Sequence, residues 1–312
     1  MAETHDLPGA RARIEGHVWR TPALNVPALD EACGVEIWLK PECLQRTGSF
    51  KYRGATNAIA RLPEGTEGVV CISSGNHAQA VARAAREAGI RCLAVMPIDS
   101  NPTKIAATTG YGAEVEREGV TGENREQIGR ARADERGWPL IHPFDDWDVI
   151  SGQATACLEL LEDAPELDAV VTPVGGGGLL SGTTLACLQD APATRVFGAE
   201  PATGDDAYRS LAQGERVRLD RTPPTIADGV RTLQLGERTF SVLREHCAGI
   251  VLVDEDALRE ALAVVWSRTK LVVEPTSALP IAALLAGAIP GRRIGVILSG
   301  GNVDAARLAG RL

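Results

Sequence analysis

The sequence predicts an α/β protein with two open, twisted, mostly parallel sheets, and two observations indicate this class. At three places, a short apolar run ends in a Gly, Ser or Asn turn, and a helical pattern follows directly. Proteins with parallel strands show this order. The length of 312 residues exceeds what one hydrophobic core usually supports. We therefore expect two closely packed lobes.

The first unit begins with an apolar strand over residues 68–72 and continues through the turn Ser73-Ser74-Gly75-Asn76. A helical pattern from about His77 to Ala88 follows, and a second strand over Arg91–Met96 comes next. This order predicts a βαβ unit.

The other two units repeat the pattern. A strand over 168–174 leads into Gly175-Gly176-Gly177-Gly178 and a helix over 179–188. A strand over Arg293–Leu298 leads into Ser299-Gly300-Gly301-Asn302, with a helix expected from there to the C-terminus. Ligands of such sheets bind outside the carboxyl ends of the strands, so the three loops are predicted to face one cleft.

Two turn-rich segments mark candidate domain boundaries. They are Pro63-Glu64-Gly65 and His142-Pro143-Phe144. We predict a large domain made of residues 1–67 and 146–312, with a small domain of residues 68–145 inserted in it.

Composition disfavours several classes of protein. Charged residues interrupt every apolar run before it could cross a bilayer, so no membrane partner is expected. Met1–Pro8 lacks the layout of a signal peptide, so we expect a cytoplasmic location. The net charge of −9 without a basic cluster disfavours nucleic acid as a partner. Seven scattered cysteines without a CxxC pair indicate reduced thiols.

The four consecutive glycines, Gly175, Gly176, Gly177 and Gly178, indicate a phosphate site. They lie between an apolar strand and a helix, where backbone N–H groups and the helix dipole favour an anion. A flexible turn is the alternative, but such a turn needs only one or two glycines. The sequence has neither a P-loop nor a complete dinucleotide fingerprint, so a ligand with a single phosphate fits best.

Only four residues are lysines, and one of them differs in its setting. Lys40, Lys104 and Lys270 are expected at the surface or at strand ends, whereas Lys51 lies between Gly48 and Gly54, where the backbone can bend around a ligand. Burial lowers the pKa of a lysine, which favours covalent and base catalysis. Lys51 is the predicted catalytic amine.

Seven short motifs span nearly the whole chain in order: 40–55 (KPECLQRTGSFKYRGA), 73–77 (SSGNH), 142–145 (HPFD), 175–178 (GGGG), 200–201 (EP), 225–230 (TIADGV) and 299–302 (SGGN). The first of them, around Lys51, resembles the lysine motif of fold-type II pyridoxal-phosphate enzymes, in their serine/threonine dehydratase and serine racemase branch, and the others continue the match. This resemblance implies a tryptophan synthase β-like fold, with the cofactor in the cleft between two sheet domains.

The resemblance implies roles for the cofactor-binding residues. Lys51 would bond to pyridoxal 5′-phosphate and act as the base at Cα, next to Phe50. Ser49 and the glycine loop with Leu179 would hold the phosphate, and Asn76 would contact the ring hydroxyl. Ser299 would meet the ring nitrogen as a neutral partner, which favours elimination over transamination.

The substrate side of the site involves two segments. The loop Ser73-Ser74-Gly75-Asn76-His77 precedes a helix and is suited to hold a carboxylate through its N–H groups; His77 itself is expected to be structural. Ser74 stands where the racemases place a second acid/base, although a small loop residue is the alternative. Arg125 aligns with an arginine that can pair with a second carboxylate, although a solvated helix charge is favoured slightly.

An acidic turn resembles the divalent-cation site of the same branch. Glu200, the Gly204 carbonyl and Asp206 would be the ligands of Mg²⁺ or Ca²⁺, which prefer oxygen donors. An acidic turn without metal is the alternative. Ser277 and Ala154 depart from the family pattern, in which Gly is usual at both positions, and these departures bear on substrate preference more than on cofactor binding.

These features predict a hydroxyamino acid dehydratase that converts L-serine or L-threonine to a 2-oxo acid and ammonia. L-threo-3-hydroxyaspartate dehydration through Arg125 and serine racemisation through Ser74 are the alternatives. A non-catalytic α/β protein that binds a phosphorylated metabolite is a more distant one. A homodimer is what the resemblance implies.

Overall fold

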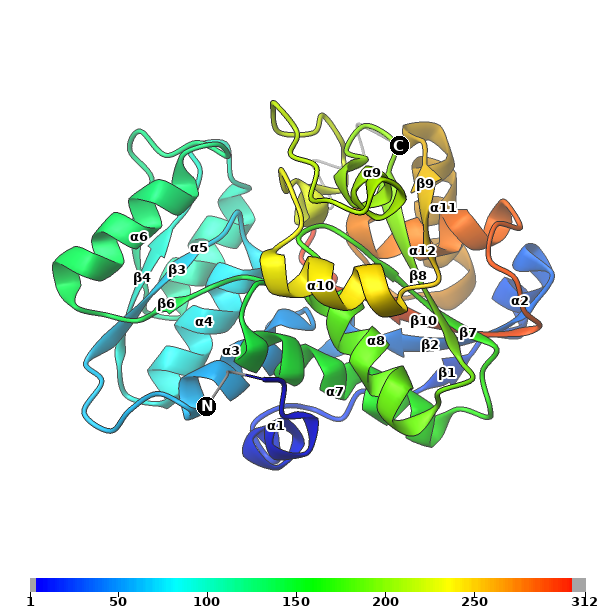
Figure 1. The fold of residues 1–312 in the computed structure, drawn as a ribbon, viewed down its shortest axis with the longest axis horizontal. Helices are drawn as coiled ribbons and strands as arrows, with labels where there is room; N and C mark the ends of the chain where they lie inside the picture. The colour runs from blue at the N-terminus through cyan, green and yellow to red at the C-terminus, as the bar shows by residue number, and fades with distance from the viewer. Residues whose placement is uncertain (1–3, 305–312) are drawn as a thin grey trace.

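The computed structural model describes residues 4–304, which form two parallel-dominated sheets side by side (Figure 1). The larger sheet has the strand order β1-β2-β10-β7-β8-β9, in which only the β1–β2 pair is antiparallel. Its strands are β1 Leu24–Asn25, β2 Glu36–Pro41, β7 Ala169–Pro173, β8 Arg195–Pro201, β9 Gly249–Val253 and β10 Arg293–Leu298.

The smaller sheet has the order β5-β4-β3-β6 and is parallel throughout. Its strands are β3 Gly68–Ile72, β4 Arg91–Val95, β5 Glu114–Glu116 and β6 Leu140–Ile141. The two sheets confirm the predicted fold class, because parallel strands need crossover helices that cover both faces.

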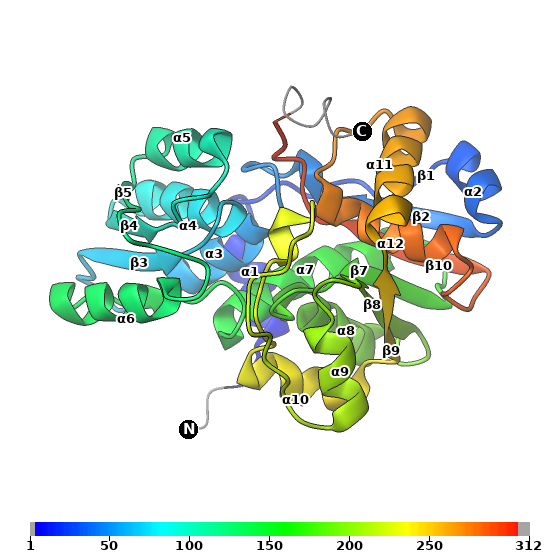
Figure 2. The ribbon, with the colours of Figure 1, turned by 90° about the horizontal axis from the view of Figure 1, so that it is seen from above.

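Helices lie on both faces of each sheet (Figure 2). On the larger sheet, α2, α11 and α12 cover one face while α1, α7, α8 and α10 pack on the other; on the smaller sheet, α3 and α4 lie opposite α6. The helices are α1 Leu7–Ile14, α2 Pro27–Cys33, α3 Lys51–Ala60, α4 Asn76–Glu87, α5 Pro102–Gly110, α6 Arg125–Arg136, α7 Trp147–Asp163, α8 Gly178–Asp190, α9 Asp206–Gln213, α10 Glu237–His246, α11 Glu255–Thr269 and α12 Pro275–Leu285.

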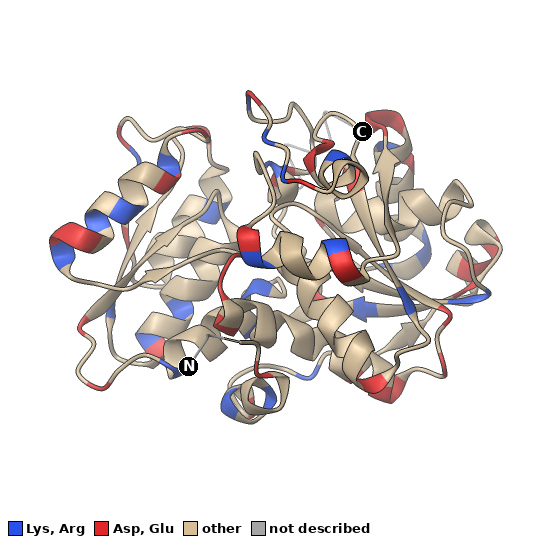
Figure 3. Ribbon diagram, viewed as in Figure 1, with Lys and Arg blue, Asp and Glu red and all other residues tan. Residues whose placement is uncertain are grey.

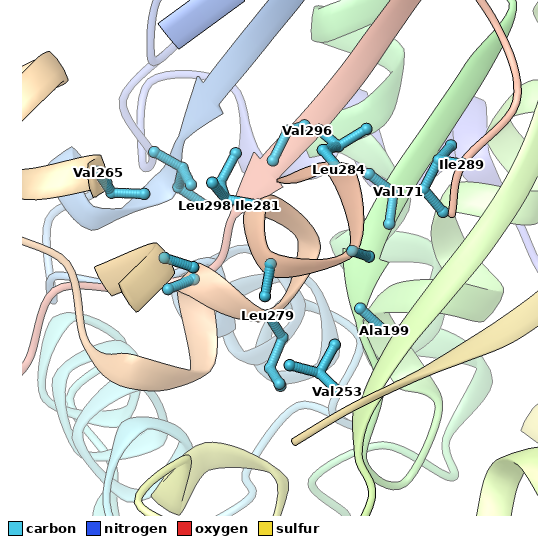
Figure 4. Close-up of a cluster of buried hydrophobic side chains, with 14 of the residues drawn as sticks. Val171, Ala199, Val253, Val265, Leu279, Ile281, Leu284, Ile289, Val296 and Leu298 are labelled. Atoms are coloured by element: carbon cyan, nitrogen blue, oxygen red, sulfur yellow. The ribbon is translucent and has the colours of Figure 1, made fainter. Parts of the chain in front are cut away.

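The core of the larger sheet shows why α12 is apolar on all sides. Leu279, Ile281 and Leu284 of this helix lie among strand residues such as Val171 and Val296 (Figure 4). The helix is enclosed between the sheet and α11, so each face of it meets other side chains. A helix in such a position needs no polar stripe.

The predicted strand–loop–helix units occur in the structure with shifts of one or two residues at most boundaries. β3 and β10 have the predicted bounds, while α4 and α8 begin one residue earlier than expected. Residues 301–304 have no regular structure, and the rest of the helix expected at the C-terminus lies outside the described residues.

Helix α3 connects the two sheets. It packs against α4 beside the smaller sheet and against α7 beside the larger one. Lys51 is its first residue, so the predicted catalytic amine lies where the two lobes meet. Among residues 4–304, no helix has both the length and the apolar character needed to cross a membrane. All seven cysteines are free thiols.

Candidate active site

Loops from both sheets line a cavity of about 100 Å³. The lysine loop follows β2, the tetraglycine loop follows β7 and Ser299 follows β10, and these are adjacent strands of the larger sheet. The loop 73–77 follows β3 of the smaller sheet. The carboxyl ends of parallel strands therefore converge on one cleft, as the sequence predicted.

The cavity brings together nearly all the predicted cofactor and substrate residues. Ser49 does not line it directly, and the predicted metal ligands lie elsewhere. The predicted residues that do line it are Phe50, Lys51, Ser73, Ser74, Gly75, Asn76, His77, Arg125, Gly175, Gly176, Gly177, Gly178, Leu179 and Ser299.

Lys51 is held by the segment that follows β10. The Phe50 N–H donates to the Ser299 carbonyl at 3.0 Å, and the Gly301 N–H donates to the Gly48 carbonyl at 2.8 Å. The Lys51 Nζ donates to the Pro143 carbonyl at 2.6 Å. Removal from water lowers the pKa of this amine to about 8, although the nearby Glu274 carboxylate opposes the shift. A neutral amine is therefore accessible near physiological pH.

The tetraglycine loop can approach a ligand closely because side chains have no room in it. A Cβ atom on Gly176 would lie 2.3 Å from the Phe144 ring, and Gly177 has a φ of +92°. Helix α8 starts at Gly178, and the first N–H groups of a helix lack partners within the helix. The loop therefore offers donors to an anion.

Two buried hydroxyl groups strengthen this interpretation. Within residues 4–304, neither the Ser49 Oγ nor the Thr232 Oγ1 has a hydrogen-bond partner, and Thr232 lines the cavity beside the glycine loop. Buried hydroxyls are normally paired. Unpaired hydroxyls, a helix N-terminus and a lysine of lowered pKa suit a ligand that carries one phosphate and one aldehyde.

Ser299 has a hydrogen-bond partner that the sequence did not reveal. Its Oγ lies 3.0 Å from the Oγ of Ser277, which also donates to the Gly300 carbonyl and accepts from the Gly300 N–H. Ser277 is one of the two departures from the family pattern. Its structural position links it to the predicted ring-nitrogen partner.

His77 has the structural setting that the sequence suggested. Its Nε2 lies 2.9 Å from the Ile141 carbonyl, and burial lowers the pKa of its imidazole to about 3. Because a carbonyl only accepts, the Nε2 carries the proton. The ring is therefore neutral and joins the start of α4 to β6.

Arg125 is not the solvated helix charge that the sequence analysis slightly favoured. Its Nη1 donates to the Ser74 Oγ at 2.8 Å, and both residues line the cavity. By contrast, Arg130, Arg132 and Arg136 form ion pairs with Glu126 of α6 and with Glu116 and Glu114 of β5. Basic and acidic positions alternate along this helix (Figure 3). Arg125 points inward because it is the first residue of α6, at the cleft end of the helix.

Lys40 lies at the end of β2, as expected, but it is buried, with 0% exposure. The expectation that Lys104 is a surface lysine is wrong, because its exposure is 3%. The Lys40 Nζ donates to Glu159 at 2.6 Å, and the Lys104 Nζ donates to Asp228 and Glu274 at 2.8 and 3.0 Å. Buried lysines are retained where carboxylates compensate their charge.

Lys104, Asp228 and Glu274 also line the cavity, although the sequence analysis gave them no role. The pair Asn101-Pro102 is a helix-start signal, and the Asn101 side chain caps α5. That signal places Lys104 in the first turn of a helix. It does not predict burial, which depends on partners 124 and 170 residues away.

The predicted metal ligands lie at the junction of β8 and α9. The Glu200 carboxylate accepts hydrogen bonds of 3.0 Å from the N–H groups of Ala207 and Tyr208. The Asp206 Oδ2 is buried and has no hydrogen-bond partner among the described residues. Burial raises the pKa of Asp206 to about 7, and burial together with Asp206 raises that of Glu200. Nowhere in residues 4–304 do three or more His, Cys, Asp or Glu side chains form a group that could hold a metal.

Comparisons with known proteins agree with this geometry. Residues 14–300 match the family model described as pyridoxal-phosphate dependent enzyme. The chain is 44% identical to serine racemase of Dictyostelium discoideum over 306 residues, 96% of this chain and 94% of the relative. It is 45% identical to L-threo-3-hydroxyaspartate ammonia-lyase of Pseudomonas sp over 316 residues, 100% and 99% of the two chains. The crystal structure of a T.th. threonine deaminase superposes with a TM-score of 0.91 at 50% identity, covering 96% of this chain and 97% of the other.

Proposed function

The chain belongs to the family of pyridoxal-phosphate dependent enzymes, and on that premise we propose that it converts L-serine and L-threonine to 2-oxo acids and ammonia. The observation that carries the proposal is the Lys51 amine, with a pKa of about 8, in a cavity lined by both the glycine loop and the loop 73–77. One loop suits the cofactor phosphate and the other a substrate carboxylate.

The residues present fit the cofactor. Lys51 would bond to its aldehyde beside Phe50. Ser49 and Gly175–Leu179 would hold the phosphate through hydroxyl and N–H donors. Asn76 would contact the ring hydroxyl and Ser299 the ring nitrogen. When bound, pyridoxal phosphate delocalises the electron pair left at Cα and so makes the Cα proton acidic.

The protein groups then move protons around the substrate. The loop 73–77 orients the carboxylate. Lys51 is released as a neutral amine when the substrate amine takes its place on the aldehyde, and it then accepts the Cα proton. Loss of the β-hydroxyl as water follows, and hydrolysis releases ammonia and the 2-oxo acid. The neutral Ser299 hydroxyl does not hold a proton on the ring nitrogen as a carboxylate would, which supports elimination.

The contact between Arg125 and Ser74 supports two further substrates or reactions. A guanidinium in the cavity can pair with the β-carboxylate of L-threo-3-hydroxyaspartate, and a relative of 45% identity is named for this reaction. The neutral Ser74 hydroxyl is available to donate its proton to Cα, which is racemisation. The Arg125 guanidinium donates a hydrogen bond to this oxygen and so stabilises the alkoxide that the transfer leaves behind, which makes the hydroxyl a stronger acid.

A substrate panel tests the proposal. The cofactor-loaded enzyme is assayed for 2-oxo acid with L-serine, L-threonine and L-threo-3-hydroxyaspartate, and D-serine is followed in parallel. Borohydride reduction followed by mass spectrometry should place the cofactor on Lys51. A protein that stays colourless with added cofactor would favour the non-catalytic alternative.

Arg125→Ala distinguishes the substrates. We expect its activity on hydroxyaspartate, relative to that on serine, to fall by roughly tenfold or more, because a charge-assisted pair is lost. Arg130→Ala, on the same helix but paired with Glu126, is the control and should leave the ratio unchanged. An unchanged ratio in Arg125→Ala would rule out the carboxylate pairing.

The remaining parts of the proposal are a homodimer, a cytoplasmic location and a divalent cation at Glu200, Gly204 and Asp206. Sedimentation of the purified protein tests the first, and localisation of the tagged protein tests the second. A rise in Tm on addition of Mg²⁺ or Ca²⁺ tests the third.

A further inference from the structure

Lys104 joins the two lobes beside the active site. It lies in the first turn of α5, next to the smaller sheet, and its Nζ donates to two carboxylates of the other lobe. Glu274, 1% exposed, is the residue before α12, and Asp228 begins the short 3₁₀ helix Asp228–Val230. An ammonium group between two carboxylates in this setting has strong electrostatic interactions, because water screens them poorly.

The second oxygen of Glu274 extends the interaction to the predicted cofactor contact. Its Oε1 accepts a 2.6 Å hydrogen bond from the Asn76 Nδ2. The Asn76 Oδ1 accepts from the Asn302 Nδ2, which also donates to the Thr47 carbonyl of the lysine loop. The hydrogen-bonded series therefore runs from Lys104 through Glu274, Asn76 and Asn302 to Thr47.

This series fixes the orientation of the Asn76 amide. Its oxygen faces a donor, Asn302, and one N–H faces an acceptor, the Glu274 carboxylate. The second N–H of the same nitrogen is left to point into the cavity. An ionised Glu274 enforces this arrangement, because a carboxylate can only accept.

The aliphatic part of Lys104 contacts the substrate loop. A Cβ atom on Gly75 would lie 2.2 Å from the Lys104 Cδ and 3.0 Å from its Cγ. The lysine stem therefore lies directly against the backbone of residues 73–77. The ammonium end of Lys104 therefore contacts the carboxylate that orients Asn76, and its aliphatic stem contacts the loop that is proposed to bind the substrate carboxylate.

We propose that Lys104 is a positioning residue, whose ammonium group keeps Glu274 an acceptor for Asn76 and whose stem supports the loop 73–77. The inference rests on the proposed function for the roles of Asn76 and that loop. Burial raises the pKa of Glu274 and Lys104 lowers it, so loss of the ammonium favours protonation of Glu274. A protonated Glu274 can donate to Asn76 and turn its amide over.

The test compares two buried lysines, Lys104→Met and Lys40→Met. Methionine keeps the stem in each case and removes the charge. Lys40 pairs with Glu159 and does not line the cavity. Both variants should lower the Tm, but only Lys104→Met should shift the visible absorption maximum of the bound cofactor at a fixed pH. It should also weaken cofactor binding to the apo-protein by about tenfold or more.

A second variant distinguishes an effect on the orientation of Asn76 from a general loss of stability. In Lys104→Met combined with Glu274→Gln, the neutral amide has an oxygen that accepts from Asn76, and the buried charge of Glu274 is removed. Asp228 also loses its partner, but its side chain is 33% exposed and stays hydrated. This double variant should recover the Tm and move the absorption maximum back toward that of the wild type. If Lys104→Met alone fails to fold, the absorption maximum and the cofactor affinity are measured on the double variant.

Two results would overturn the inference. One is a Lys104→Met protein with the wild-type spectrum and cofactor affinity. The other is a double variant that recovers stability while its spectrum stays as altered as that of Lys104→Met. Neither readout requires turnover. A wild-type protein that binds the cofactor but releases no 2-oxo acid would contradict the proposed function alone.

Discussion

At the residue scale, the properties of the site depend on groups that burial and neighbours have changed. The Lys51 amine has a lowered pKa, His77 is neutral and Arg125 is bonded to a hydroxyl group. Perturbed groups of this kind gather at functional sites more often than elsewhere. Here they line a single cavity.

The rate at which the apo-protein takes up the cofactor should depend on pH through Lys51. Only the neutral amine attacks an aldehyde, and a pKa of about 8 in place of 10.5 makes half of the amine neutral near pH 8. The rate of chromophore formation in stopped-flow absorbance should therefore rise with pH and level off above about pH 8. A rate that keeps rising until pH 10 would show an ordinary lysine pKa.

At the element scale, a buried ionic cluster anchors α3. Arg53 donates to Glu42 at 2.8 Å and to Glu159 at 2.7 and 2.8 Å, and Lys40 donates to the same Glu159. The cluster contains two positive and two negative groups. It joins α3 to the end of β2 and to α7, so the start of the lysine helix is tied to the larger sheet.

Removal of one member should unbalance this cluster. Arg53→Met leaves two buried carboxylates with Lys40 as their remaining cation, and we expect a loss of about 3–5 kcal/mol in the free energy of unfolding. Arg132→Met is the control, because its glutamate partners are partly exposed, and it should cost less than about 1 kcal/mol. Equal losses in the free energy of unfolding for the two variants, measured by urea denaturation, would contradict a structural role for the cluster.

The junction of β8 and α9 should respond to divalent cations. The carboxyl groups of Glu200 and Asp206 are buried and have raised pKa values, and the Asp206 Oδ2 has no hydrogen-bond partner among the described residues. A divalent cation bound between them would stabilise their ionised forms. Mg²⁺ or Ca²⁺ at 100 times its Kd should stabilise the protein by about 2.7 kcal/mol, seen as a rise in Tm. Asp206→Asn should abolish the rise, while Asp205→Asn, whose carboxylate faces Arg209, should keep it. No rise in the wild type would refute the site.

At the scale of the whole molecule, the two lobes are joined by the bonds of the buried Lys104 inside the cleft and by exposed polar pairs at its rim. Glu123 accepts from Thr222, and Arg231 donates to Asp99, and these four residues are partly or largely exposed. Exposed pairs of this kind contribute little stability. Because α3 packs in the core of the smaller sheet, we propose that α3 and residues 68–145 shift together against the larger sheet when ligands bind.

Spin labels can measure this motion. A label pair at Ile98→Cys and Leu188→Cys joins the two lobes at exposed positions, and a substrate analogue should shift and narrow the distance distribution in the cofactor-loaded enzyme. A pair at Ile98→Cys and Glu135→Cys lies within residues 68–145 and should not change. Unchanged distances for both pairs would show a rigid molecule.

The sequence alone predicted four of the strands, β3, β4, β7 and β10, together with the loops that follow β3, β7 and β10 and Lys51 as the candidate amine. These features depend on local periodicity, on glycine and on helix-start signals, which neighbouring residues encode. The resemblance extended this list to Asn76 and Ser299, which the structure places in the same cavity.

Only the tertiary structure decided the surroundings of these residues. It buried Lys104 against Glu274, turned Arg125 toward Ser74 and placed Ser277 beside Ser299. The partners in these pairs are between 22 and 170 residues apart. Burial and charge compensation depend on which distant groups the fold brings together, and no local pattern contains that information.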